Sequence, residues 1–135
     1  MKRKKPKRWH LELYLAVYRL TVIVAWEVSY ITILNLARRR GVTVTPEKFG
    51  KDLLKIHESK ATGYCLELGD DNDDVLVYLR HLPKKSYDYG TLYHELFHAV
   101  QFIMRSRNMK DELESPAYLY EHLATQCNKY FWARR

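Results

Sequence analysis

The segment from His94 to His98 has residue types and a spacing that could hold and use a metal ion. It reads His-Glu-Leu-Phe-His, and residues four apart on a helix lie on one face. His94 and His98 could therefore both direct ring nitrogens at one ion about 2.0–2.1 Å away. Glu95 would lie roughly 100° further round the helix, where its carboxylate could accept a proton from a metal-bound water. The pattern predicts a zinc-dependent hydrolase with Glu95 as general base.

Such a zinc ion needs a third protein ligand, which leaves its fourth position to water. Four downstream residues are candidates because an antiparallel helix would carry them back beside the histidines: Glu112, Glu114, Glu121 and His122. Glu114 is the first choice, since it begins the last expected helix, where a carboxylate also suits the positive helix N-terminus. Glu121, two turns further on, is the second choice. The simpler alternative is that Glu114 is only a first-turn acid.

The helix that carries the two histidines is expected to run from about Thr91 to Arg107, and the last helix from about Glu114 to Trp132. The first of these is rich in apolar residues, so it should be largely buried. Placing two His and one Glu in such a helix costs several kcal/mol unless they have partners. This cost favours a functional site over a pair of surface histidines. Three tyrosines near the motif are candidates for an additional electrophile: Tyr89, Tyr93 and Tyr118.

The first half of the chain predicts strands and helices in turn. A β-branched and aromatic run from Tyr18 to Trp26, which could begin as early as Leu11, indicates a strand. Residues 27–40 have helical spacing and end in three arginines before Gly41, a typical helix stop; a longer strand through Ile33 is the alternative. Thr45 and Pro46 predict the start of another helix, which ends near Ser59.

Two further strands, 64–68 and 75–82, flank a polar turn and so predict an antiparallel hairpin, and residues 83–90 predict a loop. Asp70, Asn72 and Asp74 in that turn match the first half of a calcium loop. The sixth position is Val75 and the twelfth is His81, where such a loop needs Gly and Glu. A solvated turn is therefore the better interpretation.

Composition limits the organisation to one domain. The 135 residues carry a net charge of +7, and six of the 23 basic residues lie within the first eight positions. We expect a disordered basic tail at residues 1–9, with weak polyanion contact as its alternative role, and a single domain at 10–135. The two cysteines, Cys65 and Cys127, form no CxxC pair and are expected to be free thiols in a reducing compartment.

The apolar stretch from residue 11 to residue 36 raises the question of a membrane span. Glu12, Arg19 and Glu27 interrupt it, and each charge at mid-bilayer would cost about 2.5–3.5 kcal/mol. We therefore expect no membrane segment and a cytoplasmic protein. The expected fold class is α+β, in which a small antiparallel or mixed sheet packs on the helix carrying His94 and His98, with the C-terminal helix beside it.

The stretches 89–100 and 114–119 resemble small phage and prophage zincin-like metallopeptidases of the minimal gluzincin type. The resemblance covers residues 64–125 and implies that Glu114, within a Glu-x-x-Ala-Tyr stretch, is the third ligand to Zn²⁺. It also implies a peptide or protein substrate that pairs with an edge strand, here 75–82. Two alternatives to a metallopeptidase stay open, namely a catalytically inactive zinc-stabilised binding or regulatory module and a nucleic-acid-binding protein that uses the basic tail.

Overall fold

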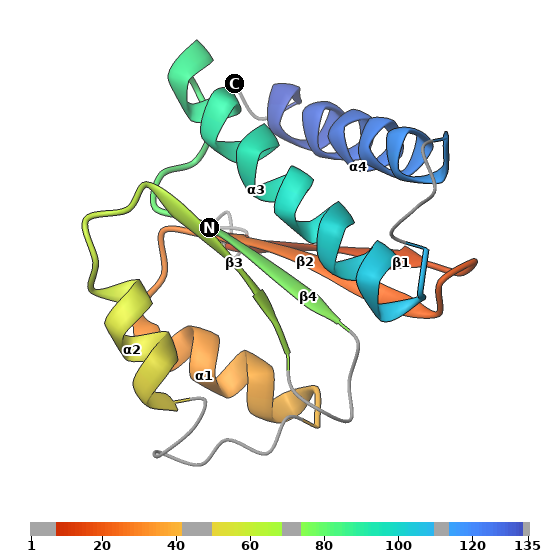
Figure 1. Ribbon diagram of the computed structural model, residues 1–135. Helices are drawn as coiled ribbons and strands as arrows, with labels where there is room; N and C mark the ends of the chain where they lie inside the picture. The colour runs from red at the N-terminus through yellow and green to blue at the C-terminus, as the bar shows by residue number, and fades with distance from the viewer. Residues whose placement is uncertain (1–7, 42–49, 69–73, 110–113, 134–135) are drawn as a thin grey trace, which may run out of the picture.

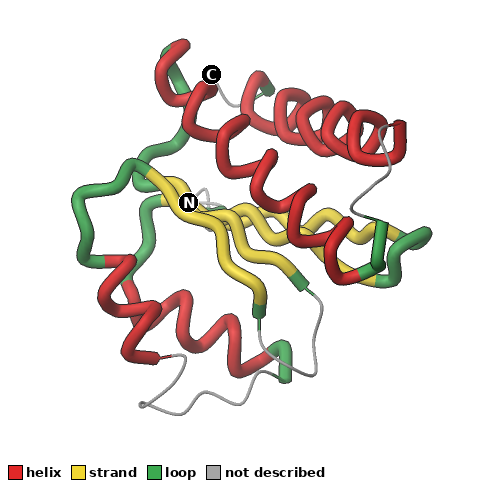
Figure 2. Tube along the Cα trace, viewed as in Figure 1, coloured by secondary structure: helices red, strands yellow, loops and turns green. Residues whose placement is uncertain are grey.

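The computed structural model describes residues 8–41, 50–68, 74–109 and 114–133. Within these ranges the chain is α+β, with one mixed four-stranded sheet between two helical layers, as Figures 1 and 2 show. Helices α1 (Tyr30–Arg39) and α2 (Lys51–His57) cover one face of the sheet. Helices α3 (Ser86–Ser106) and α4 (Glu114–Trp132) cover the other. The expected fold class is confirmed at this level.

The N-terminal apolar stretch folds as a hairpin rather than as one long strand. Strand β1 (His10–Leu15) pairs antiparallel with β2 (Leu20–Trp26). The turn between them is closed by the Tyr18 amide, which donates to the Leu15 carbonyl at 3.1 Å, and Arg19 takes a positive φ of 54°. All seven residues of β2 are buried, because helices cover both faces of the sheet, and this explains its continuous apolar run.

Helix α1 ends where the sequence indicates, but it begins at Tyr30, three residues after the expected residue 27. The Ser29 hydroxyl caps its first turn by accepting from the Thr32 amide at 3.4 Å, and Gly41 follows the last turn with a φ of 83°. The alternative strand through Ile33 is therefore wrong. Helix α2 confirms the second expected helix in part, since its proposed start at Thr45 and Pro46 lies outside the described residues.

Strands β3 (Gly63–Glu67) and β4 (Val75–Leu79) form the expected antiparallel hairpin. Most of the acidic turn lies outside the described residues, but Asp74 is buried. Its carboxylate accepts from the Thr21 amide at 2.7 Å and pairs with Arg40 at 3.3 Å. Asp74 therefore ties the hairpin to β2 and α1, which agrees with a structural role for this end of the turn.

The order of the strands corrects one expectation. The sheet runs β1-β2-β4-β3, so β4 lies between β2, its parallel partner, and β3. The resemblance placed an edge strand at 75–82, and this is wrong because parallel pairing with β2 draws β4 into the interior, where all five residues are buried. The edge strand next to α3 is β3 instead.

Helix α3 starts at Ser86, five residues before the expected Thr91. The Asp88 carboxylate accepts from the Lys84 and Lys85 amides at 3.1 and 3.0 Å, and this cap extends the helix into the expected loop. Helix α4 has the bounds that the sequence predicts. None of the helices in the described ranges combines the length and the apolarity that a bilayer span requires.

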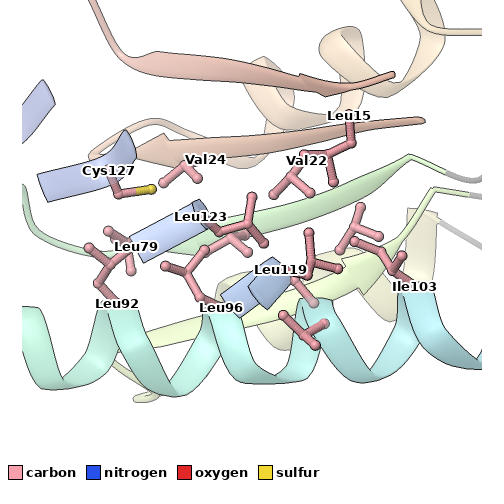
Figure 3. Close-up of a cluster of buried hydrophobic side chains, with 14 of the residues drawn as sticks. Leu15, Val22, Val24, Leu79, Leu92, Leu96, Ile103, Leu119, Leu123 and Cys127 are labelled. Carbon is pink, nitrogen blue, oxygen red and sulfur yellow. The ribbon is translucent and has the colours of Figure 1, made fainter. Parts of the chain in front are cut away.

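The hydrophobic core between α3, α4 and the sheet holds α3 against the strands. Figure 3 shows Leu92, Leu96 and Ile103 of α3 pointing toward the strands, with α4 closing the side. All three α3 residues are fully buried. Because 3.6 residues make one turn, the histidine face of α3 is turned away from this core.

Gly63 lets α3 approach the edge strand closely. A Cβ at this position would lie 2.8 Å from the Tyr78 carbonyl oxygen and 3.3 Å from Cγ of Glu95. We expect Gly63→Ala to lower the free energy of unfolding by about 1–3 kcal/mol, because the carbonyl is backbone and cannot swing away. Gly90→Ala is the matched control, since the Cβ of an alanine at position 90 would have no atom within 4 Å. Urea unfolding of both variants tests this, and equal stability of Gly63→Ala and the parent would contradict it.

Candidate metal and catalytic site

The two histidines of α3 meet at their ring nitrogens. Nε2 of His94 lies 3.2 Å from Nε2 of His98, and the ring centroids are 4.7 Å apart. A tetrahedral zinc ion about 2.05 Å from each of two nitrogens would hold them about 3.3 Å apart. The helix thus places the pair at the spacing that one shared ion requires. The same approach lets one ring donate a hydrogen bond to the other in the metal-free chain.

Gln101, one turn after His98, was not identified from the sequence. Its side-chain oxygen lies 3.2 Å from Nδ1 of His98. When Nδ1–H donates to that oxygen, the proton is held there and the lone pair of Nε2 faces His94. The i, i+3 spacing from a candidate ligand is the signal that could have found Gln101.

Gln101→Leu is expected to weaken zinc binding about 10–100-fold without unfolding the protein. The substitution leaves the His98 ring without its orienting acceptor, and position 101 is exposed, so the core is untouched. Competition with a chromophoric chelator gives the affinity. Arg105→Leu, an exposed change one turn further along α3, is the control, and an unaltered zinc affinity in Gln101→Leu would rule out the orienting role.

Glu95 is buried beside the exposed His94 and the half-buried His98. It is 7% exposed, whereas the His94 side chain is 68% exposed, and Oε1 of Glu95 lies 4.0 Å from Nε2 of His94. Burial raises the pKa of the Glu95 carboxyl, and His94 and His98 partly oppose this shift. A carboxylate with a raised pKa beside a possible metal ligand has the properties of a general base.

The buried charge of Glu95 predicts a pH-dependent stability difference in metal-free protein. Because the folded pKa is raised, ionised Glu95 costs stability at pH values above that pKa and costs nothing when it is protonated. Zinc-free Glu95→Gln should therefore be more stable than the parent at pH 7.5, by about 0.5–2 kcal/mol, and the gain should disappear near pH 4. Thermal unfolding at both pH values tests this; a gain independent of pH would contradict it.

An open groove of about 540 Å³ lies between the start of β3 and α3. Its walls come from the segment that leads into the edge strand and from the N-terminal half of α3, and they are Ala61, Thr62, Gly63, Tyr87, Gly90, Thr91, His94 and Glu95. The close approach at Gly63 brings Glu95 to this groove. The candidate base and one candidate ligand therefore face a space beside the free edge of the sheet.

Tyr87 is the tyrosine at this groove, and it was not among the expected three. It is exposed and lies two helical turns before His94 on the same face. The Tyr93 hydroxyl donates to Asn128 at 2.7 Å, Tyr89 is buried, and Tyr118 lines a different cavity near the β1–β2 turn. Tyr87 is thus the better candidate for an additional electrophile.

Within the described part of the chain, no third candidate zinc ligand completes a site with His94 and His98. Among the described residues, no group of three or more His, Cys, Asp or Glu side chains has an arrangement that could hold a metal ion. Helix α4 runs antiparallel to α3, since Tyr93 bonds Asn128 and the Phe97 ring lies 6.3 Å from that of Tyr120. Glu114, exposed at the first position of α4, therefore lies toward the C-terminal half of α3.

The antiparallel alignment of α3 and α4 also gives the positions of the other candidate metal ligands. Glu121 follows Tyr120 and is exposed at about the level of the Phe97 ring, nearer the histidine pair along α3 than Glu114 is. His122 lines the cavity near the β1–β2 turn instead. Glu112 lies outside the described residues. Both cysteines are free thiols, as expected, and burial raises the pKa of each, that of Cys127 to about 12.

Comparisons with known proteins found no protein that is similar to this chain. The described geometry places His94 and Glu95 on one groove, with His98 beside His94, and leaves the third ligand to be identified. Family models, curated proteins and solved structures were all searched, and none matches this chain.

Proposed function

We propose that the chain is a zinc-dependent metallopeptidase that hydrolyses peptide bonds, with Glu95 as general base. The observation that carries this proposal is the 3.2 Å separation of the two Nε2 atoms beside a buried carboxylate on an open groove. A helix surface without a function has no need of this combination, since burying Glu95 costs stability.

The donor set fits zinc. His94 and His98 would supply imidazole nitrogens, and Glu114, or else Glu121, would supply a carboxylate oxygen; nitrogen and oxygen ligands of this kind suit Zn²⁺. Bound zinc supplies Lewis acidity, which lowers the pKa of a coordinated water toward about 7. Gln101 would keep the His98 ring in the orientation that ligation requires.

Glu95 performs the proton transfers in this proposal. Its carboxylate accepts a proton from the attacking water and then passes it to the nitrogen of the leaving amine, so that the base is regenerated. Burial keeps the carboxyl pKa above its usual value, which favours the first transfer, the uptake of the proton from water. Tyr87, which lines the groove from the same helix as His94, would donate a hydrogen bond to the carbonyl oxygen as negative charge develops there.

Strand β3 would bind the substrate backbone. It is an edge of the sheet, and its outward N–H and C=O groups can pair with an extended peptide. The groove that contains Glu95 begins at Gly63, the first residue of this strand. A peptide paired with β3 would therefore pass Glu95 and His94 with one carbonyl inside the groove.

The two alternatives have less support. A structural zinc site prefers four protein ligands and gives no role to a buried Glu95. The nucleic-acid alternative depends on the basic tail, of which residues 1–7 lie outside the described ranges.

Chelator-reversible peptide cleavage tests the proposal. Full-length protein is treated with EDTA, dialysed, and assayed on a quenched-fluorescence peptide library before and after adding one equivalent of zinc. The proposal predicts cleavage only after zinc is restored. Full zinc occupancy without cleavage would instead favour the inactive zinc module, and absence of zinc together with salt-dependent nucleic-acid binding would favour the tail-based alternative.

A further inference from the structure

A second groove, of about 360 Å³, lies between α3 and α4 on the other side of the histidine pair. It is lined by Phe97 and Val100 of α3 and by Pro116, Ala117 and Tyr120 of α4. Apart from the Tyr120 hydroxyl, these side chains carry no polar atom. Phe97 is 54% exposed here, so much of its ring is accessible to a bound group.

The groove begins one helical turn from a candidate metal ligand. Phe97 follows His94 by three residues, and such neighbours on a helix have Cβ atoms about 5–6 Å apart. This is less than the span of two residues of extended peptide, at about 3.3 Å each. A peptide whose carbonyl lies at the histidine pair could therefore place the side chain of an adjacent residue between Phe97 and Tyr120.

We infer that this α3–α4 groove binds a large apolar side chain of the substrate, next to the bond that is cleaved. This inference rests on the proposed function and names its substrate class: peptides with a residue such as Leu, Met or Phe beside the scissile bond.

The apolar lining of the α3–α4 groove favours an apolar side chain over a charged one. Among the described residues no charged side chain lines the groove, so a bound Asp or Lys side chain would lose its hydration without gaining a partner there. A leucine or phenylalanine side chain would bury apolar area against Phe97 and Val100, worth about 1.5–3 kcal/mol when complete. The volume is at the small end of the usual range for ligand sites, as expected for one side chain.

Ala117→Asp tests the groove because Ala117 is exposed and its replacement places a charge in the groove without disturbing the core. Thr125→Asp, an exposed change on the same helix outside the groove, is the control. The zinc-loaded parent should cleave Leu and Phe sublibraries with a kcat/KM at least about 10-fold above that for Asp sublibraries. Ala117→Asp should remove this preference, mainly through KM, and Thr125→Asp should keep it.

Binding to an inactive variant separates this inference from the proposed function. Zinc-loaded Glu95→Gln is titrated with blocked Gly-Gly-Leu-Gly-Gly and its Asp counterpart while the methyl signals of Ala117 and Val100 are followed by NMR. Selective shifts with the Leu peptide would support the groove even if no variant cleaves peptides. Cleavage without side-chain preference, no methyl shifts, or a dimer that Ala117→Asp dissociates would each overturn the inference.

Discussion

Glu95→Gln is expected to lower kcat/KM for peptide cleavage by the zinc-loaded protein by about 10²–10⁴-fold, the usual contribution of a general base. The amide keeps the shape of the side chain but cannot accept a proton from water. Zinc content should not fall, because Glu95 lies beside the pair formed by His94 and His98 rather than between them. The loss should therefore appear in kcat at full zinc occupancy, as single-turnover assays can establish.

The control for this experiment is Glu58→Gln, which removes one exposed carboxylate at the end of α2. It should leave both cleavage and zinc content unchanged. If Glu95→Gln cleaves as fast as the parent, Glu95 is not the base and the catalytic part of the proposal fails. If it loses zinc as well as activity, Glu95 belongs to the metal site, and its role is different from the one proposed.

Glu114→Ala is expected to weaken zinc binding by more than about 100-fold, beyond the range usual for groups that only orient a ligand. The expectation follows from the resemblance of residues 114–119 to the metallopeptidase pattern. The described arrangement does not bring Glu114 to the histidines, so this expectation comes from the sequence pattern alone. Competition titration with a chelator of known affinity measures the change.

Glu121→Ala is the matched variant, since it removes an equally exposed glutamate from the same helix. It should bind zinc as the parent does. A loss in Glu121→Ala alone would move the third ligand two turns along α4, to the level of Phe97, where the helix register places it nearer the pair. Unchanged affinity in both variants would exclude both glutamates as the third protein ligand.

Local patterns predicted the elements that are specified locally. Helix α4 has the expected bounds, α1 ends at its arginines and Gly41, and the β3–β4 hairpin follows from two strand-like runs around a polar turn. In each, the decisive signals lie within a few residues of one another. The i, i+4 spacing likewise predicted the meeting of His94 and His98, which the helix imposes by itself.

The features that the sequence did not predict depend on contacts between distant segments. Parallel pairing joins Val24 to Val77, and nothing near β4 indicates that it lies inside the sheet rather than at its edge. The β1–β2 turn contains no glycine, proline or asparagine and depends on a positive φ at Arg19. Tyr87 was missed because its helix was expected to start only at Thr91, whereas α3 begins at Ser86. The third ligand depends on how α4 lies against α3, which spacing alone does not determine.

The most direct test of the central claim is the zinc stoichiometry of purified full-length protein, measured by elemental assay after dialysis and repeated for His94→Ala and His98→Ala. The two imidazoles of α3 should hold one ion per chain, and either substitution should release it while the far-ultraviolet circular dichroism stays the same. A parent protein that remains free of zinc in the presence of excess metal, or histidine variants that retain it, would contradict the claim.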